Sequence, residues 1–270
     1  MPWVDVRGGR ISYSVAGRGE AVLLIAGLGG LGSFWQAQID ALAPHFTTIT
    51  FDHRGVGDST GRPPYSIEQW AEDSIALLDH IGIEKAHFVG HSAGGVIAQV
   101  VTSVHPHRVT SVVLGATWMV PDERFRRVFG LRRDVLSALG TDAYALLGSI
   151  LIAPSNETLD AIKPDLTNSG IIKARIDALL NYHGIEYLRR IRCRALVLAA
   201  ADDVLIPLHM SRAVAAGIAG AELKILPEGS HSFPRSRADD YNRIVCEFLS
   251  NHAASQSDTS ITAGGEGDRL

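Results

Sequence analysis

Short apolar segments rich in β-branched residues alternate along the chain with longer segments of helical periodicity, and this alternation most constrains the fold. Residues 21–26 (AVLLIA) and 195–200 (ALVLAA) are almost continuously apolar, which is typical of parallel strands covered by helices on both faces. Strands that alternate with helices predict an α/β fold with a doubly wound, mostly parallel sheet. The predicted strands are residues 10–15, 21–26, 47–51, 86–89, 109–114, 195–200 and 222–226. The predicted helices are residues 34–42, 66–81, 93–104, 208–216 and 237–249.

The alternation stops between residues 118 and 191, where only helical periodicity remains. We therefore predict a core made of residues 1–117 and 192–252, with an inserted helical cap at residues 118–191. Residues 253–270 are rich in Ser, Thr, Gly and Asp, and this composition predicts a disordered tail.

Composition and charge narrow the classes of function. The chain has 270 residues, of which 46% are hydrophobic and 20% charged, with a formal net charge of -4. These values predict a globular protein that does not attract nucleic acid or an anionic membrane through its overall charge. No apolar run approaches the roughly 18 residues that a membrane span needs. Because Cys193 and Cys246 lack the spacing of metal ligands, we expect reduced thiols and no metal or cofactor.

These features predict a cytoplasmic location, because the first residues also lack an apolar segment typical of secretion. The expected partner is a small-molecule substrate rather than nucleic acid or a membrane. Composition leaves open whether the chain forms a homodimer.

A predicted nucleophile lies in residues 90–94 (GHSAG), between a predicted strand and a predicted helix. This G-x-S-x-G pattern places a serine on a sharp turn, where glycines on either side avoid collisions with neighbouring backbone. The amides at the start of the following helix point toward the reacting centre and stabilise a developing oxyanion. A glycine-rich turn without catalytic function is the plainer alternative, but the strand–turn–helix context favours Ser92 as a nucleophile.

A serine hydroxyl needs a neighbouring base, and the chain contains 11 histidines. His231 lies in the loop between the last predicted strand and the last predicted helix. Such loops converge at the carboxyl ends of parallel strands, where sites form. Asp202 and Asp203 follow the strand at residues 195–200, and because adjacent side chains point in different directions, only one of them can orient His231.

Five motifs appear in the order typical of the α/β-hydrolase superfamily. They are the glycine loop at residues 27–32, D-x-R-G-x-G-x-S at 52–59, G-x-S-x-G at 90–94, D-x-x-x-P at 203–207 and G-x-H at 229–231. The chain therefore resembles this superfamily over about residues 10–250. The glycine loop lacks the G-K-[ST] ending of a phosphate-binding loop.

The resemblance implies the roles of several residues. Asp203, four residues before Pro207, matches the acid of a Ser-His-Asp triad, with Asp202 as the first alternative. The backbone N–H groups of Leu28 and Ala93 match the oxyanion hole. Some relatives carry the acid nearer the cap, which keeps Asp122 as a further alternative. The chain departs from the usual pattern at Ala26, where many relatives have histidine.

Within the superfamily, the chain is most similar to small-metabolite catabolic hydrolases. LIAGLGGLGSFW and IRCRALVLAAADDVLIP resemble segments of aminoacrylate hydrolases, whereas DHRGVGDS and IGIEKAHFVGHSAGG also resemble 3-oxoadipate enol-lactonases. Acetamidomethylene-succinate hydrolases share this size. The resemblance implies hydrolysis of a small ester, lactone or amide/enamine-type C–N bond, as by a carboxylesterase or an amidase. A C–C hydrolase of ring-cleavage products and a ligand sensor on the same fold are the alternatives.

The predicted cap supplies candidates for binding the substrate. One or two of its arginines pointing inward would bind a substrate carboxylate, although arginines on a solvated helix face are the plainer interpretation. The candidate residues are Trp118, Met119, Arg124, Arg127, Tyr182 and Tyr187.

Overall fold

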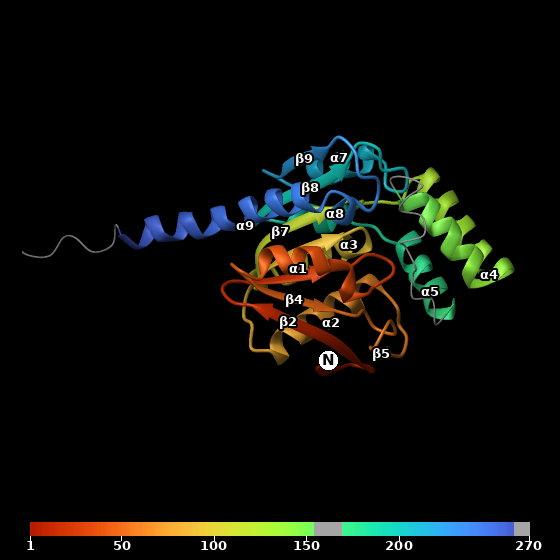
Figure 1. The fold of residues 1–270 in the computed structure, drawn as a ribbon, viewed down its shortest axis with the longest axis horizontal. Helices are drawn as coiled ribbons and strands as arrows, with labels where there is room; N and C mark the ends of the chain where they lie inside the picture. Colours follow the sequence, from red (N-terminus) through yellow and green to blue (C-terminus); the bar gives the residue numbers. More distant parts are fainter. Residues whose placement is uncertain (154–168, 262–270) are drawn as a thin grey trace, which may run out of the picture.

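One mixed sheet forms the centre of the molecule (Figure 1). The computed structural model describes residues 1–153 and 169–261, with side chains up to residue 251. The strands in this part are β1 (Trp3–Val6), β2 (Gly9–Gly17), β3 (Ala21–Ile25), β4 (Thr47–Phe51), β5 (Thr60–Gly61), β6 (Ala86–His91), β7 (Val109–Gly115), β8 (Arg194–Ala200) and β9 (Glu222–Leu226). Their order is β1-β2-β4-β3-β6-β7-β8-β9, and β5 pairs with β2.

The sheet is parallel from β4 to β9 and antiparallel only at its N-terminal edge. β3 pairs in parallel with both β4 and β6, whereas β2 pairs antiparallel with β1 and β4. Every residue of β3 and of β6 is buried, so helices and loops cover both faces of the central strands. This arrangement confirms the predicted α/β fold. The short edge strands β1 and β5 were not predicted, since neither has a continuous apolar run.

Helices connect the strands and cover the sheet. They are η1 (Gly32–Trp35), α1 (Gln36–Leu42), α2 (Ile67–His80), α3 (Ala93–Val104), η2 (Pro106–Arg108), α4 (Glu123–Ile152), α5 (Ser169–Leu180), α6 (Ile185–Arg190), α7 (Leu208–Gly217), α8 (Phe233–Ser236) and α9 (Ala238–Ile261). Helix α2 packs on α3, and α1 packs on α9. Helix α2 begins where its capping signal predicts, because the Ser66 hydroxyl accepts a hydrogen bond from the Gln69 amide at 3.2 Å.

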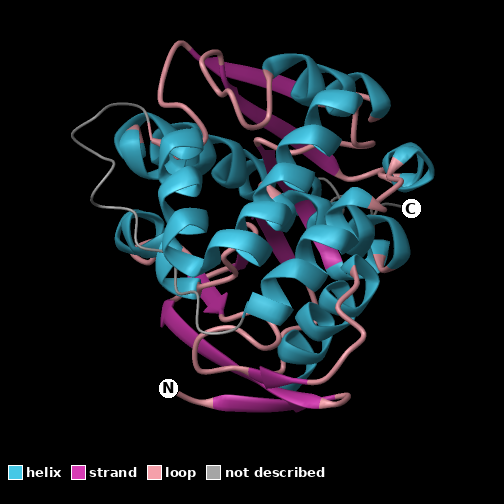
Figure 2. Cartoon of the chain, turned by 90° about the vertical axis from the view of Figure 1, so that its right-hand side faces the viewer, coloured by secondary structure: helices cyan, strands magenta, loops and turns pink. Residues whose placement is uncertain are grey.

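Helices α4, α5 and α6 occupy the described part of the predicted cap. Helices α4 and α5 lie side by side at the right of Figure 1, and Figure 2 views the molecule from that side, with helices in front of the strands. Residues 154–168 of the predicted cap lie outside the described residues. The division into a core and a cap stays a prediction.

Among the described residues, α4 is the one helix long and apolar enough to cross a membrane, by length and composition alone. The sequence predicted no such span, because polar residues interrupt each apolar run. A single helix of this kind is weak evidence for a membrane, since helices of ordinary globular proteins pass the same test. Gly140, at φ 82° and ψ -170°, also breaks α4 into two helical pieces.

Helix α9 departs from the sequence prediction at its C-terminal end. It continues to Ile261 and extends away from the sheet (Figure 1), so residues 253–261 of the predicted disordered tail are helical. Buried Tyr241, Val245 and Leu249 anchor the first part of α9. An anchored helix propagates more easily than it starts, which explains how a polar segment continues it. Residues 262–270 lie outside the described residues.

Candidate active site

Ser92 lies on a sharp turn between β6 and α3. Its backbone has φ 56° and ψ -120°, a region that residues other than glycine adopt at a cost of about 1–3 kcal/mol. The turn is tight because a Cβ on Gly90 would collide with the carbonyl of Gly94, and a Cβ on Gly94 would collide with the carbonyl of Ile25. The glycines of the motif are therefore required by close backbone approach.

Hydrogen bonds hold the main chain of Ser92 on both sides. Its amide donates to the carbonyl of Gly115 at 2.8 Å. Its carbonyl accepts a hydrogen bond from the Thr117 hydroxyl at 3.0 Å. These contacts from β7 and the loop after it maintain the strained conformation.

His231 and Asp203 form a buried hydrogen-bonded pair. His231 Nδ1 donates to Asp203 Oδ2 at 2.8 Å, and the side chains are 9% and 1% exposed. The other carboxylate oxygen of Asp203 accepts from the amides of Leu205 at 2.9 Å and Ile206 at 2.8 Å. The carboxylate is therefore fixed in the orientation that holds a proton on Nδ1 and leaves Nε2 of His231 able to accept one.

Asp202 faces the backbone of the histidine loop. Its carboxylate accepts from the amides of Ser230 at 2.8 Å and Gly229 at 3.1 Å. Adjacent aspartates thus contact the same loop in two ways: Asp202 binds its main chain, and Asp203 binds the imidazole of His231. This geometry favours Asp203 over Asp202 as the residue that orients His231.

Asp122 has different partners. Its carboxylate caps α4 by accepting from the amide of Phe125 at 2.7 Å, and it also contacts Nε2 of His209 at 2.8 Å. Both carboxylate oxygens of Asp122 are thus engaged away from His231. Burial acts to raise the pKa of the Asp122 carboxyl. The hydrogen bond from the Phe125 amide and the charge of His209 outweigh this effect and lower the pKa.

His91 connects the nucleophile turn to the histidine loop. Its Nε2 donates to the carbonyl of His231 at 2.9 Å, and the two imidazole rings lie 4.9 Å apart, centre to centre. Burial lowers the pKa of His91 well below the ordinary 6.5, and the His231 charge lowers it further. A neutral His91 therefore connects the turn that carries Ser92 to the main chain of His231.

The glycine loop after β3 approaches Ser92 closely. A Cβ on Gly27 would lie 3.2 Å from Cβ and 3.7 Å from Oγ of Ser92. The carbonyl of Gly27 accepts from the amide of Gly30 at 3.0 Å, which turns the loop back on itself. Leu28 directly follows Gly27, and Ala93 directly follows Ser92. The two predicted oxyanion-hole residues therefore flank the close approach of Gly27 to Ser92.

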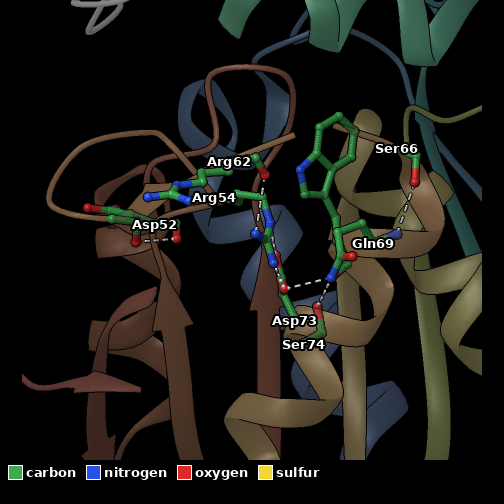
Figure 3. A network of polar contacts seen from close by, with 9 residues as sticks. Asp52, Arg54, Arg62, Ser66, Gln69, Asp73 and Ser74 are labelled. Carbon is green, nitrogen blue, oxygen red and sulfur yellow. Dashed lines mark hydrogen bonds and ion pairs between the residues drawn. The ribbon is translucent and has the colours of Figure 1, made fainter. Parts of the chain in front are cut away.

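A polar network supports the loop beside this site (Figure 3). Asp52 accepts from the amides of Gly32 at 2.9 Å and Asp58 at 3.1 Å. Arg54 donates through Nε to Asp73 at 2.9 Å, and both side chains of this ion pair are almost fully buried. Burial raises the pKa of Asp73, whereas its contacts with Arg54 act in the opposite direction.

The three predicted substrate-binding aromatic residues are all at least partly buried near α3. Trp118 is fully buried and lies 4.6 Å from the ring of Phe125. The hydroxyl of Tyr182 donates to the side-chain carbonyl of Gln99 at 3.0 Å, and the ring of Tyr187 stacks on that of Tyr182. Met119 is half-buried, and its carbonyl accepts from the amide of Gly184 at 2.6 Å.

The expectation that Arg124 or Arg127 points inward is wrong. Both side chains are exposed, and Arg127 pairs with Glu123 one helical turn earlier. The buried arginines in the described part of the predicted cap are instead Arg132 and Arg175, at 7% and 1% exposure. Arg175 was not among the candidates, although its helical spacing from apolar residues on α5 places it on the buried stripe.

Among the described residues, no three His, Cys, Asp or Glu side chains gather as a metal site would require.

Comparisons with known proteins identify the class of protein to which this fold and the arrangement around Ser92 belong. Residues 20–136 match the family model described as the alpha/beta hydrolase fold. Over 247 residues, 87% of this chain and 92% of the relative, the sequence is 36% identical to a protein of Caulobacter sp. (strain K31) that bears the name carbamate hydrolase RutD. The chain belongs to the α/β hydrolase family, and it is an enzyme of the hydrolase class.

More specific similarities point to catabolic hydrolases. A protein of the same name from Azorhizobium caulinodans is 33% identical over 260 residues, which cover 92% of this chain and 98% of the relative. The crystal structure of the enol-lactonase from Burkholderia xenovorans LB400 superimposes with a TM-score of 0.85 at 25% identity, covering 92% of this chain and all of that one. These similarities confirm the family resemblance inferred from the motifs.

Proposed function

We propose that this enzyme is a serine hydrolase that cleaves an ester, lactone or amide-type C–N bond in a small metabolite, as part of a cytoplasmic catabolic pathway. The observation that carries the proposal is the buried pair of His231 and Asp203, connected to the turn that carries Ser92. Asp203 contacts the imidazole of His231, and His91, the residue before Ser92, donates a hydrogen bond to the carbonyl of His231.

The proposed reaction has two halves. Ser92 Oγ attacks the substrate carbonyl while His231 Nε2 takes the serine proton, and His231 then gives that proton to the leaving group. The amides of Leu28 and Ala93 stabilise the tetrahedral oxyanion. Water, deprotonated by His231, attacks the acyl-enzyme and releases the acid and free Ser92. Throughout, Asp203 holds the proton on Nδ1 of His231.

The relatives support the proposed bond types. Two of them bear the name carbamate hydrolase, and the neighbouring crystal structure is an enol-lactonase. One mechanism covers both reactions, because each breaks a bond between a carbonyl carbon and a heteroatom. A small carbonyl compound is therefore the substrate class that we propose.

Labelling with a fluorophosphonate, followed by mass spectrometry, tests the activated serine. We expect one adduct on Ser92 in the wild type and none in His231→Ala. His209→Ala is the matched control, because His209 pairs with Asp122 on the surface, and it should keep the adduct. A folded wild-type protein without an adduct would contradict the proposal.

Substrate profiling then separates the remaining functions. Turnover of small esters or lactones, without turnover of vinylogous diketones, would support the proposed bond types. The reverse profile would indicate a C–C hydrolase. Tight ligand binding with very slow turnover of every compound would indicate a ligand sensor.

A further inference from the structure

Two arginines from α4 and α5 are buried and have no negatively charged partner among the described residues. Arg132 is 7% exposed and Arg175 is 1% exposed. Within residues 1–153 and 169–251, the hydrogen-bond partners of these two side chains are neutral oxygen or nitrogen atoms. Because an uncompensated buried charge is strongly destabilising, this arrangement requires an explanation.

Arg175 contacts the glycine loop, and one of its nitrogens has no hydrogen-bond partner among the described residues. Its Nε donates to the carbonyl of Leu28 at 3.0 Å, and its Nη2 donates to Nδ1 of His53 at 2.8 Å. The guanidinium also lies 4.5 Å from the ring centre of Trp70. Nη1 is buried and has no hydrogen-bond partner in the described part of the chain. Burial lowers the pKa of Arg175 to about 10, which still leaves it positively charged at neutral pH.

Arg132 shows the same pattern on α4. Its Nη2 donates to the hydroxyl of Tyr144 at 3.1 Å, and its guanidinium lies 5.1 Å from the ring centres of both Phe129 and Tyr144. Its Nε is buried and also lacks a partner among the described residues. Aromatic faces stabilise the cation only partly, and one N–H group remains unsatisfied.

Tyr144 brings the two arginines into one environment. Burial raises the pKa of Tyr144, and the charges of Arg132 and Arg175 both act to lower it. Both guanidinium groups therefore lie close enough to influence the phenol. Because its pKa is above the ordinary 10, Tyr144 is neutral at neutral pH and cannot serve as their counterion.

Both arginines are connected to the surroundings of Ser92. Arg175 Nη2 lies 3.4 Å from the carbonyl of Gly27, and a Cβ on Gly27 would lie 3.2 Å from Cβ of Ser92. Arg132 packs on Phe129, and Phe129 contacts Trp118. The residue before Trp118 is Thr117, whose hydroxyl donates to the Ser92 carbonyl.

We propose that Arg132 and Arg175 form an anion site that binds a carboxylate of the substrate, while Ser92 attacks a carbonyl elsewhere in the same molecule. The proposal rests on the proposed function, because it assigns a charge to the substrate of that same site. A carboxylate accepts hydrogen bonds from guanidinium groups with favourable geometry. It would satisfy Arg175 Nη1 and Arg132 Nε and supply the missing negative charge.

A merely structural role for Arg175 has a different signature. If Arg175 only positions the glycine loop, its loss should slow the hydrolysis of charged and neutral substrates equally. If it binds the substrate carboxylate, its loss should mainly affect the charged substrate. The ratio of the two kcat/KM values therefore distinguishes the roles.

Monomethyl succinate and dimethyl succinate provide this comparison, because they differ in one negative charge. We expect the wild type to prefer the half-ester by about tenfold or more in kcat/KM, because hydrogen bonds to a charged carboxylate are stronger than those to a neutral ester. Arg132→Gln and Arg175→Gln should lose most of this preference. Arg126→Gln is the matched control, because Arg126 lies exposed on the same α4 helix as Arg132, and it should keep the preference. No preference in the wild type, or a full preference in both variants, would overturn the proposal.

Binding without catalysis separates this inference from the proposed function. In Ser92→Ala, propionate should raise the melting temperature more than the same concentration of propionamide. The double variant Ser92→Ala/Arg132→Gln should lose this difference. If Arg175→Gln does not fold, the Arg132→Gln variants still test the anion site. A selective shift from propionate in Ser92→Ala, together with a wild type that hydrolyses neither ester, would uphold the anion site and contradict the proposed function. Equal shifts from both compounds would overturn the anion site.

Discussion

His91 donates its Nε2 proton to the backbone carbonyl of His231 at 2.9 Å. The residue before Ser92 therefore holds the main chain of the residue that we propose as its base. This hydrogen bond needs a proton on Nε2, so Nδ1 of the neutral ring carries none. Nδ1 is buried and has no hydrogen-bond partner among the described residues. Protonating Nδ1 would place a charge in the core, which explains why the pKa of His91 lies well below 6.5.

The first prediction concerns stability in acid. Below pH 6.5 the unfolded chain protonates His91 whereas the folded chain does not, so the unfolded state binds more protons and the free energy of unfolding falls as pH falls. Over this window, His91 alone contributes a loss of about 1.4 kcal/mol per pH unit. Urea unfolding from pH 7.5 downward should therefore give a flatter profile for His91→Gln.

His107→Gln, which changes an exposed histidine, should keep the wild-type profile. Some acid sensitivity should remain in His91→Gln, because burial also lowers the pKa of His53 well below 6.5. Identical slopes for the wild type and His91→Gln would refute the argument.

The second prediction separates the adjacent aspartates. Asp203→Asn should keep its contacts with the amides of Leu205 and Ile206 but present an NH2 group to His231, which favours the wrong tautomer. We expect kcat to fall by about four orders of magnitude, with little change in melting temperature. Asp202→Asn should mainly lower the melting temperature, because one carbonyl oxygen must replace two carboxylate oxygens that hold the histidine loop. Kinetics and thermal unfolding of both variants check this, and the opposite pattern would make Asp202 the orienting acid.

The third prediction uses two glycines near Ser92. A Cβ on Gly94 would lie closer to the carbonyls of Ile25 and Ala26 than real Cβ atoms approach other atoms, whereas a Cβ on Gly29 would have no neighbour within 4 Å. Gly94→Ala should therefore destabilise the fold severely or prevent it from forming. Gly29→Ala should fold with nearly wild-type stability. Soluble yield and urea unfolding measure the difference, and a stable Gly94→Ala would show that the turn can relax.

The fourth prediction concerns the Arg54–Asp73 ion pair (Figure 3). Asp73→Ala leaves a buried guanidinium without its partner, which should lower the free energy of unfolding by about 3–5 kcal/mol. Asp5→Ala removes a carboxylate from an exposed pair with Arg10 and should cost no more than about 1 kcal/mol. Denaturant unfolding of both variants gives the comparison. Equal losses would mean that burial does not set the strength of the Arg54–Asp73 pair.

Local patterns predicted much of the fold. β4 and β9 begin and end at the predicted residues, and α3 matches its predicted bounds. β4 is rich in β-branched residues, β9 contains alternating polar and apolar residues, and the G-x-S-x-G motif predicts that a helix follows its serine. The tail was predicted less well. Composition alone says little about a polar segment that continues an anchored helix, as α9 does.

Sequence patterns alone predicted the α/β class, the position of Ser92 and His231 in loops at strand ends, and three candidate acids, Asp202, Asp203 and Asp122. Each of these depends on short-range periodicity or on the order of motifs. Which aspartate faces His231 depends on tertiary contacts, because the two adjacent carboxylates share one local sequence but have different partners across the fold. The tertiary structure also replaced Arg124 and Arg127 with Arg132 and Arg175 as the buried cations, since burial depends on which helix face packs against distant segments of the chain.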